Sequence, residues 1–186
     1  MKIQYNSPVI LTYAILCATV LLLSDILGEG FMSFFTLFGN FNPGSLLDYF
    51  RLLSYTIGHG NWPHLVGNIA MILVVGPNLE QKYGSKNLLV MMVITALVTA
   101  VLNIVLFNDN ILGASGIVFM LILLSSFASF KKGYIPLTFI LVFLLYVGGE
   151  VLNSFNEDHI SQFGHIMGGL CGGVFGFFVE TNENGT

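Results

Sequence analysis

Six long apolar runs dominate this sequence and constrain what it can fold into. A helix that crosses a bilayer needs about 20 predominantly apolar residues. Only 9% of the 186 residues are charged, whereas soluble domains average about 25%. We therefore expect an all-α polytopic membrane protein, in which a bundle of six transmembrane helices forms a single domain over residues 1–186. The predicted spans are 8–27, 64–81, 87–107, 115–130, 134–152 and 162–179.

The placement of basic residues predicts how the bundle is oriented. Loops on the cytoplasmic side of a membrane carry an excess of lysine and arginine. Of the 6 basic residues, only Arg51 falls on the side opposite to the others. We therefore expect both termini to be cytoplasmic, and the second, fourth and sixth spans to run from the outside inward. The basic residues on the predicted cytoplasmic side are Lys2, Lys82, Lys86, Lys131 and Lys132.

The connection between the first two predicted spans, residues 28–63, is long and rich in aromatic residues. Aromatic side chains gather at the boundary between hydrocarbon and water. We expect this external segment to lie in the interface, although an ordinary aromatic belt would give the same composition. The aromatic residues are Phe31, Phe34, Phe35, Phe38, Phe41, Tyr49 and Phe50.

Two polar side chains stand out at the starts of predicted spans. Ser115 follows Gly113 and Ala114 at the start of the fourth span, and His165 lies just inside the sixth. A hydroxyl or an imidazole is costly in hydrocarbon unless it is paired or functional. Taken singly, Ser115 could be a small packing residue, and His165 a satisfied polar group or part of an ion pathway. Together they are suited to act as a nucleophile and its base.

The second predicted span adds two more polar groups at a similar depth. Helical rise of about 1.5 Å per residue places Asn68 level with Ser115 and His165, with His64 one turn nearer the outside. His64 and Asn68 share one helix face and can both donate hydrogen bonds, which would stabilise an oxyanion. Taken alone, His64 and Asn68 would be interpreted as polar side chains that pack between helices.

The fourth predicted span is too short to cross the membrane. From Ser115 onward it rises roughly 24 Å, against a hydrocarbon core of about 30 Å. The irregular backbone before it, including Gly113 and Ala114, is tolerated at that depth only against protein or a water-filled cavity. We therefore expect an externally open, wet cavity above Ser115, which hydrolysis in a membrane requires.

Small residues repeat along the sixth predicted span, with Gly168 and Gly172 four positions apart and Gly169 and Gly173 likewise. Such small-xxx-small spacing lets two helix backbones approach closely. We expect it to bring the sixth span against the fourth, and His165 toward Ser115.

These motifs together resemble the rhomboid family of intramembrane serine proteases, in its minimal six-span bacterial form. The matching elements are HGNWPHLVGN with His59, His64 and Asn68, GPNLE with Gly76 and Glu80, GASG with Ser115, and GHIMGGLCGG with His165, Gly168 and Gly172. GxSG alone is a weak motif, but the four elements in this order are highly specific.

The resemblance implies a Ser115/His165 catalytic dyad without an acidic third member. It also implies an oxyanion site that uses His64, Asn68 and the backbone N–H of Ser115. We place Gly113 and Ala114 with the oxyanion and substrate-binding residues.

Two positions depart from the family pattern. Phe119 stands where a tyrosine often stacks on the catalytic imidazole, and phenylalanine can still stack. Phe50, before Arg51, stands where tryptophan is frequent, in a loop that the resemblance places in the outer leaflet.

The resemblance further implies membrane-anchored protein substrates, cut in or near their transmembrane segments. The expected location is the plasma (inner) membrane of a bacterium, with the active site opening to the external side. The sequence shows no metal or nucleotide motif, so we expect no cofactor and no nucleic-acid partner, and it leaves the oligomeric state open.

Two other functions compete with proteolysis. An inactive rhomboid relative would bind membrane clients, but such proteins usually lack the serine or the histidine. A small transporter would need symmetric broken helices in its two halves, which this sequence lacks.

Overall fold

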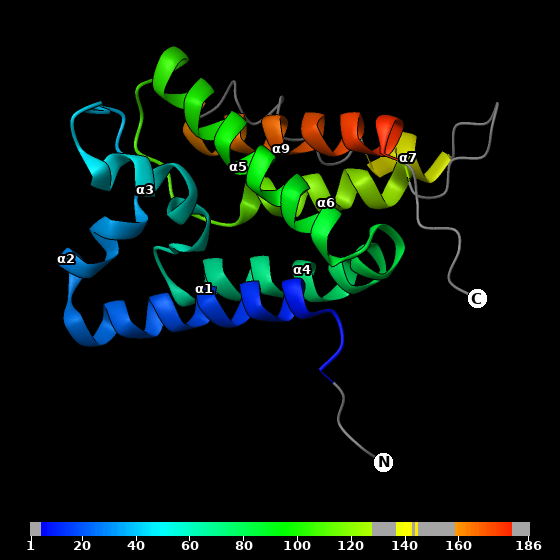
Figure 1. Ribbon diagram of the computed structural model, residues 1–186, viewed down its shortest axis with the longest axis horizontal. Helices are drawn as coiled ribbons and strands as arrows, with labels where there is room; N and C mark the ends of the chain where they lie inside the picture. Colours follow the sequence, from blue (N-terminus) through cyan, green and yellow to red (C-terminus); the bar gives the residue numbers. More distant parts are fainter. Residues whose placement is uncertain (1–4, 128–136, 143, 145–158, 180–186) are drawn as a thin grey trace.

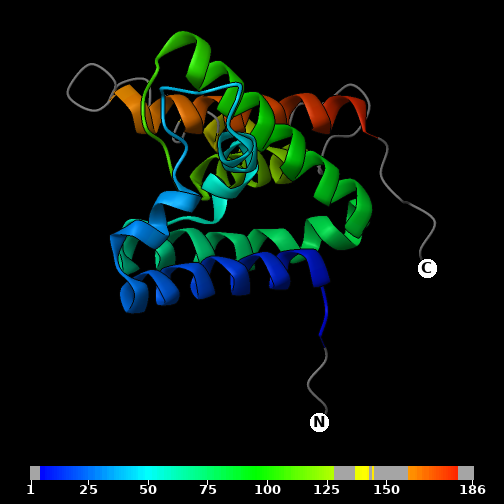
Figure 2. The ribbon, with the colours of Figure 1, turned by 60° about the vertical axis from the view of Figure 1, so that its left-hand side comes forward.

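The computed structural model describes residues 5–127, 137–142, 144 and 159–179. That part of the chain is helical, without a β-strand, and has one isolated β-bridge between Leu37 and Ile111. Helices α1 (Pro8–Leu27) and α4 (Trp62–Tyr83) lie side by side, as Figure 1 and Figure 2 show. Helix α5 (Ser85–Leu106) runs diagonally along one side of this pair and of a second pair formed by α6 (Ser115–Phe127) and α9 (His159–Phe178).

The predicted spans agree closely with the helices that the structure describes. Helices α1, α4 and α5 are long and apolar enough to cross a membrane, and their ends lie within two residues of the predicted ones. Helices α6 and α9 hold shorter apolar segments, Ser115–Ser126 and Phe163–Phe178. Of the fifth predicted span, 134–152, α7 (Leu137–Val142) covers a part, and most of the rest lies outside the described residues. The protein is an integral membrane protein, and the count of six spans stays a prediction.

The ends of α4 follow from local sequence signals. The Asn61 side chain accepts a hydrogen bond from the backbone N–H of His64 at 2.8 Å, which caps the helix start. Gly84, with a positive φ of 81°, ends the helix and bonds back to the Glu80 carbonyl. Pro77 lies inside α4, and the helix continues to Tyr83.

The connection between α1 and α4 is folded into short helices. They are α2 (Glu29–Met32), the 3₁₀ turn η1 (Ser33–Phe35), α3 (Leu46–Ser54) and the 3₁₀ turn η2 (Tyr55–Ile57). The side chain of Ser45 caps α3 by accepting from the N–H of Asp48. Several large apolar side chains of the connection are exposed, as expected for a segment at a membrane interface: Phe34, Leu46, Tyr49, Phe50 and Leu53.

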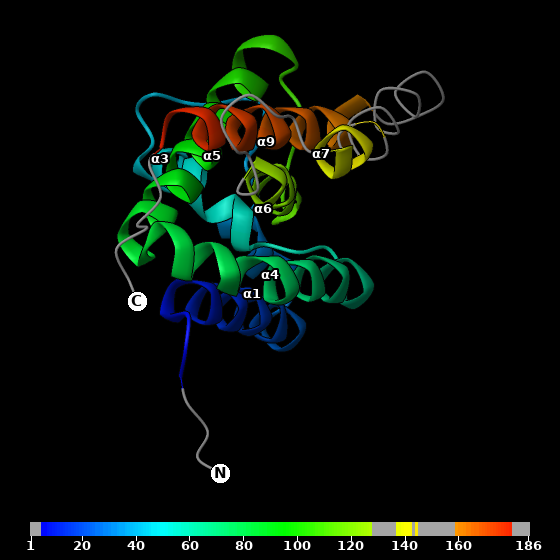
Figure 3. The ribbon, with the colours of Figure 1, turned by 90° about the vertical axis from the view of Figure 1, so that its right-hand side faces the viewer.

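Helix α6 forms the centre of the bundle, surrounded by α4, α5, α7 and α9 in the end-on view of Figure 3. Every residue from Ile117 to Leu124 is buried. A helix that is apolar on all sides can lie either in the core of a protein or against lipid, and other helices cover α6. The central position of α6 places Ser115 inside the protein.

The predicted contact between the fourth and sixth spans is confirmed. A side chain on Gly168 would overlap the backbone oxygen of Gly116, and one on Gly172 would overlap that of Met120. Moving four residues along α9, from Gly168 to Gly172, also moves the contact four residues along α6, from Gly116 to Met120. The two helices therefore run parallel, as the charge placement predicts. The glycine spacing thus brings two backbones into direct contact.

Glu80 joins three helices at the end of the bundle opposite the 28–61 connection. Its carboxylate accepts from the backbone N–H groups of Val9 and Ile10, at 3.0 Å each, and from the hydroxyl of Ser85 at 2.6 Å. A carboxylate at a helix N-terminus satisfies free N–H groups and the positive end of the helix dipole. Glu80 is therefore a structural anchor.

Candidate active site

Ser115 is the first residue of α6. The carbonyl of Ala114 accepts the first hydrogen bond of the helix from Val118 at 2.9 Å, and the Ala114 methyl is fully buried in the core. Gly113 has a φ of +125°, a conformation that other residues rarely adopt. The serine thus follows a sharp turn at a helix N-terminus, where backbone N–H groups have no partner within the helix.

His165 lies against the face of α6 that carries Ser115 and Phe119. Its ring stacks on Phe119, with centroids 4.4 Å apart and an interplanar angle of 6°. Phe119 follows Ser115 by four residues and therefore shares its face of the helix. The two helices approach closely at this level, because a Cβ on Gly116 would be 3.2 Å from the carbonyl oxygen of Gly164. The predicted pair thus belongs to two adjoining helices.

His64, in the first turn of α4, faces the turn before Ser115. A Cβ on Gly113 would lie 2.8 Å from Cε1 and 3.0 Å from Nε2 of His64, so only glycine leaves room for the ring. His64 and His165 are also close enough to interact electrostatically. The structure therefore brings His64, Gly113 and His165 around Ser115.

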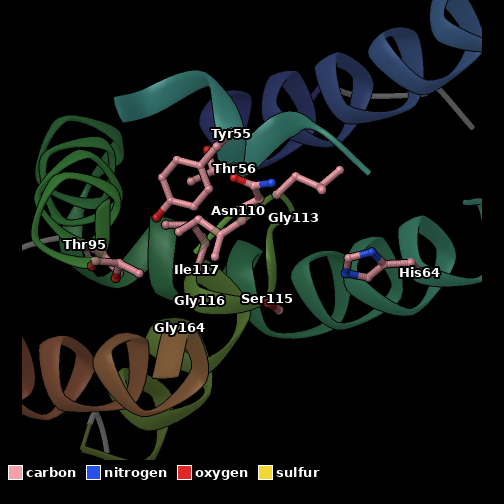
Figure 4. A pocket seen from close by; sticks show the side chains of 13 residues that line it. Tyr55, Thr56, His64, Thr95, Asn110, Gly113, Ser115, Gly116, Ile117 and Gly164 are labelled. Carbon is pink, nitrogen blue, oxygen red and sulfur yellow. The ribbon is translucent and has the colours of Figure 1, made fainter. Parts of the chain in front are cut away.

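A cavity of about 230 Å³ lies beside Ser115, and Figure 4 shows the residues that line it. His64 reaches it from α4, Thr95 and Thr99 from α5, and Gly164 from α9. The cavity that the short fourth span predicts is therefore present. Its opening to the external side stays a prediction. The remaining wall is formed by Tyr55, Thr56, Asn110, Ile111, Leu112, Gly113, Gly116 and Ile117.

Asn68 lies next to this group without lining the cavity. Its Nδ2 is 3.2 Å from Nε2 of His59, while Nδ1 of His59 is 3.4 Å from the carbonyl of Ile57. Since Nδ2 of an amide can only donate, Nε2 of His59 accepts and Nδ1 carries the proton that faces Ile57. The ring of His59 in turn meets that of His64 edge to face at 5.0 Å.

His59 is fully buried before the start of α4. Burial, with a smaller contribution from the nearby His64 ring, lowers the pKa of His59 from 6.5 to about 4. The imidazole is therefore neutral at pH 7, which the acceptor role of Nε2 requires.

The family comparison matches residues 47–181 of the chain to the Rhomboid domain. The chain belongs to the rhomboid family. Rhomboids are a family of intramembrane serine proteases, which also has pseudoprotease members. Comparison with curated proteins gives no match.

The matched region of this rhomboid covers the three segments that meet at the cavity, namely His59–Asn68, Gly113–Ser115 and Gly164–His165. In the part of the chain that the structure describes, no group of three or more His, Cys, Asp or Glu residues could hold a metal ion. The two cysteines, Cys17 and Cys171, are free and buried.

The structure adds residues that the sequence did not single out. The N–H of Gly113 donates to the carbonyl of Tyr55 at 2.9 Å, so this predicted site residue uses its donor within the fold. Thr95 and Thr99 line the cavity from one face of α5. Two polar residues four positions apart in an apolar run are a sequence pattern that could have indicated their place in the site. Tyr55 and Asn110 carried no comparable pattern.

Proposed function

We propose that this rhomboid is an intramembrane serine endopeptidase, with Ser115 as the nucleophile and His165 as its base. One observation carries the proposal: the His165 ring lies on Phe119, one turn along the α6 face that begins with Ser115. In the proposed arrangement, a base on a second helix would face the hydroxyl of a serine that lines a cavity, as a nucleophile and its base need.

In the proposed reaction, the hydroxyl of Ser115 attacks a peptide carbonyl while His165 takes the hydroxyl proton. The tetrahedral intermediate collapses when His165 returns that proton to the leaving amine, which breaks the peptide bond and leaves an acyl ester on Ser115. Water then attacks the ester while His165 takes a proton from it. His165 returns this proton to the Ser115 oxygen as the ester bond breaks and the new carboxyl end is released. The cavity beside Ser115 provides room for that water.

Two kinds of donor would stabilise the oxyanion. The N–H of Ser115 stands at the N-terminus of α6, where the helix dipole also favours negative charge. His64 lines the cavity and can donate from its ring. Asn68 retains a second amide hydrogen besides the one given to His59, and its role as a donor remains part of the proposal. Gly113 and Ala114 would border the bound substrate.

The proposed substrates are membrane-anchored proteins that enter from the bilayer and are cut in or near a transmembrane segment. The placement of five lysines on one side supports cytoplasmic termini and a cavity that opens to the outside. The parallel direction of α4, α6 and α9 is consistent with this orientation (Figure 1). For a minimal rhomboid of this kind, we propose the bacterial plasma membrane as its location.

Labelling with a fluorophosphonate probe tests the proposal directly. We expect the purified protein in proteoliposomes to be labelled at Ser115, and the Ser115→Ala and His165→Ala variants to lose both labelling and cleavage of a single-span substrate. Ser126→Ala is the matched control, because Ser126 lies on the same helix and its hydroxyl donates to the backbone carbonyl of Ile122 one turn earlier. Cleavage by purified Ser115→Ala protein would overturn the assignment. A folded wild-type protein without labelling or cleavage would favour client binding instead.

A further inference from the structure

The loop that leads to Ser115 is held by segments from elsewhere in the chain. It follows the end of α5 and runs through residues 107–114. Asn103, fully buried in the last turn of α5, donates from Nδ2 to the carbonyl of Asp109 at 2.7 Å. The Asn103 carbonyl accepts from the N–H groups of Phe107 and Asn108. These three bonds fix how the chain leaves α5.

A second contact comes from residues 36–39, in the connection between α1 and α4. Leu37 and Ile111 exchange both backbone hydrogen bonds, each 2.9 Å long, as a pair in an antiparallel ladder does. Two residues on, the N–H of Gly39 donates to the side-chain oxygen of Asn110 at 3.2 Å. Leu37 is itself buried, packed with Tyr55 and Ile111. A short extended segment thus runs beside the loop.

At Gly39, the backbone of the 36–39 segment lies directly against the backbone of the loop. A Cβ at this position would overlap the carbonyl group of Asn108 and contact the N–H of Asp109. Gly39 does not have a positive φ, so its lack of a side chain serves the close approach and not an unusual backbone conformation. Any larger residue would push the 36–39 segment and the loop apart.

The backbone of the loop before Ser115 belongs to no helix or sheet that would pair its N–H and C=O groups. These groups must therefore form hydrogen bonds with other segments of the protein. The loop backbone does this through Asn103 near its start, Leu37 in its middle, and Tyr55 at Gly113. The side chain of Asn110 adds a bond by accepting from the N–H of Gly39. From Ile111 to Ser115 the chain has few residues in which to absorb a displacement. The position of the serine therefore depends on the segment paired with Ile111.

We propose that residues 36–39 form a positioning segment for the nucleophile, with Gly39 and Asn110 as positioning residues. This segment holds the loop in place, and the loop determines where the Ser115 hydroxyl lies relative to His165. The inference rests on the proposed protease function and adds residues that lie outside the sequence motifs of the site. It predicts that separating the segment from the loop slows the chemical step more than it weakens substrate binding.

Gly39→Ala tests the close approach, and Gly30→Ala is its matched control. Gly30 lies in the same connection, and nothing stands within 4 Å of a Cβ built on it. Because a displacement near 1 Å can cost about 10²-fold in rate, we expect Gly39→Ala to lower kcat and the rate of fluorophosphonate labelling of Ser115 by at least about tenfold. KM should stay within about twofold, and Gly30→Ala should match the wild type in all three measurements.

A second pair of variants decides the matter if Gly39→Ala does not fold. Asn110 is exposed, so Asn110→Ala should keep the melting temperature while it removes the acceptor for Gly39. We expect a severalfold loss of kcat, most of which Asn110→Asp recovers because a carboxylate accepts the same bond. Asn42→Ala is the control, since it removes an equivalent bond to Gly44 in an exposed turn of the same connection.

The outcomes separate this inference from the proposed function. If the wild-type protein shows no labelling of Ser115, the protease assignment itself fails. If the wild type is labelled, and folded Gly39→Ala and Asn110→Ala keep its kcat and labelling rate, the positioning inference is overturned while the protease assignment stands. A rise in KM with unchanged kcat would also overturn it, because that result would assign the segment to substrate binding.

Discussion

The ring of His165 lies parallel to that of Phe119, with their centroids 4.4 Å apart. Phe119 is buried, so this contact holds the imidazole from the side of the central helix. Where related proteins often have tyrosine at this position, the structure shows that phenylalanine supports the stack without a hydroxyl. The orientation of the proposed base therefore depends on ring overlap.

Replacing the aromatic ring tests this dependence. An aromatic pair contributes about 0.5–1.5 kcal/mol beyond its buried area, so we expect Phe119→Leu to lower kcat roughly two- to twelvefold. Phe119→Tyr should retain nearly full activity, because its ring can stack in the same way. Cleavage of a single-span substrate at saturating concentration, with the melting temperature of each variant, provides the measurement. Equal activity of the leucine and wild-type proteins would show that packing elsewhere orients His165.

The stability of the fold should fall as the pH decreases from about 6.5 to about 4. The pKa of His59 is about 4 in the fold and 6.5 when the ring is free in water. Between these values the unfolded chain binds a proton that the folded one excludes, so the stabilisation is complete above 6.5 and is lost as the pH falls. The protonation of His59 lowers the free energy of unfolding by at most about 1.4 kcal/mol per pH unit.

Chemical denaturation across that pH range checks the prediction, with His59→Gln as the comparison. The variant should be less stable at pH 7 and show a flatter dependence on pH. Asp48 contributes in a different range, because the N–H of Asn42 and the Arg51 guanidinium lower the pKa of its carboxyl below 3.8. If the free energy of unfolding falls equally steeply with pH in both proteins between pH 6.5 and 4, His59 is excluded as the cause of the pH dependence.

The sequence predicted those features that depend on local pattern. The long apolar runs gave the ends of α1, α4 and α5 to within two residues, because burial in a bilayer leaves a continuous signal. The glycines at 168 and 172 predicted the contact between α6 and α9, since small residues at that spacing let two membrane helices approach closely.

Contacts between irregular segments that lie far apart in the sequence were not predictable. The pairing of Leu37 with Ile111 joins two short stretches with no alternating pattern, so nothing in either one indicates the other. The bond between Asn68 and His59 was missed for a related reason. Periodicity places Asn68 on the face of His64, but only the path of residues 57–61 brings His59 beside it.

The orientation of the bundle can be tested without reference to catalysis. Asn110 and Gln81 are exposed at opposite ends of the helices, and the two native cysteines are buried. From the lysine placement, we expect Asn110→Cys to react with a membrane-impermeant maleimide added to intact cells, and Gln81→Cys to react only after lysis. The wild-type chain serves as the blank. Labelling of Gln81→Cys in intact cells would invert the proposed topology and place the cavity on the cytoplasmic side.

His64 and Asn68 should differ in how their loss affects the reaction. His64 lines the cavity and fits against Gly113, whereas the one bond that the structure gives the Asn68 side chain goes to His59. A donor to the oxyanion acts chiefly in the transition state, so its removal should lower kcat and leave KM nearly unchanged. Loss of one such donor typically costs about 10²–10³ in kcat.

We therefore expect His64→Ala to lose about 10² in kcat with little change in melting temperature, since the ring is half-buried beside a cavity. Asn68→Ala should have a smaller effect on kcat and a larger one on stability, because it leaves Nε2 of buried His59 without its donor. A double variant distinguishes the two roles. If Asn68 acts through His59 and His64, its loss should add little to the loss of kcat in His64→Ala. If Asn68 donates to the oxyanion independently, the two losses should multiply, and that result would restore the role that the sequence motif implies.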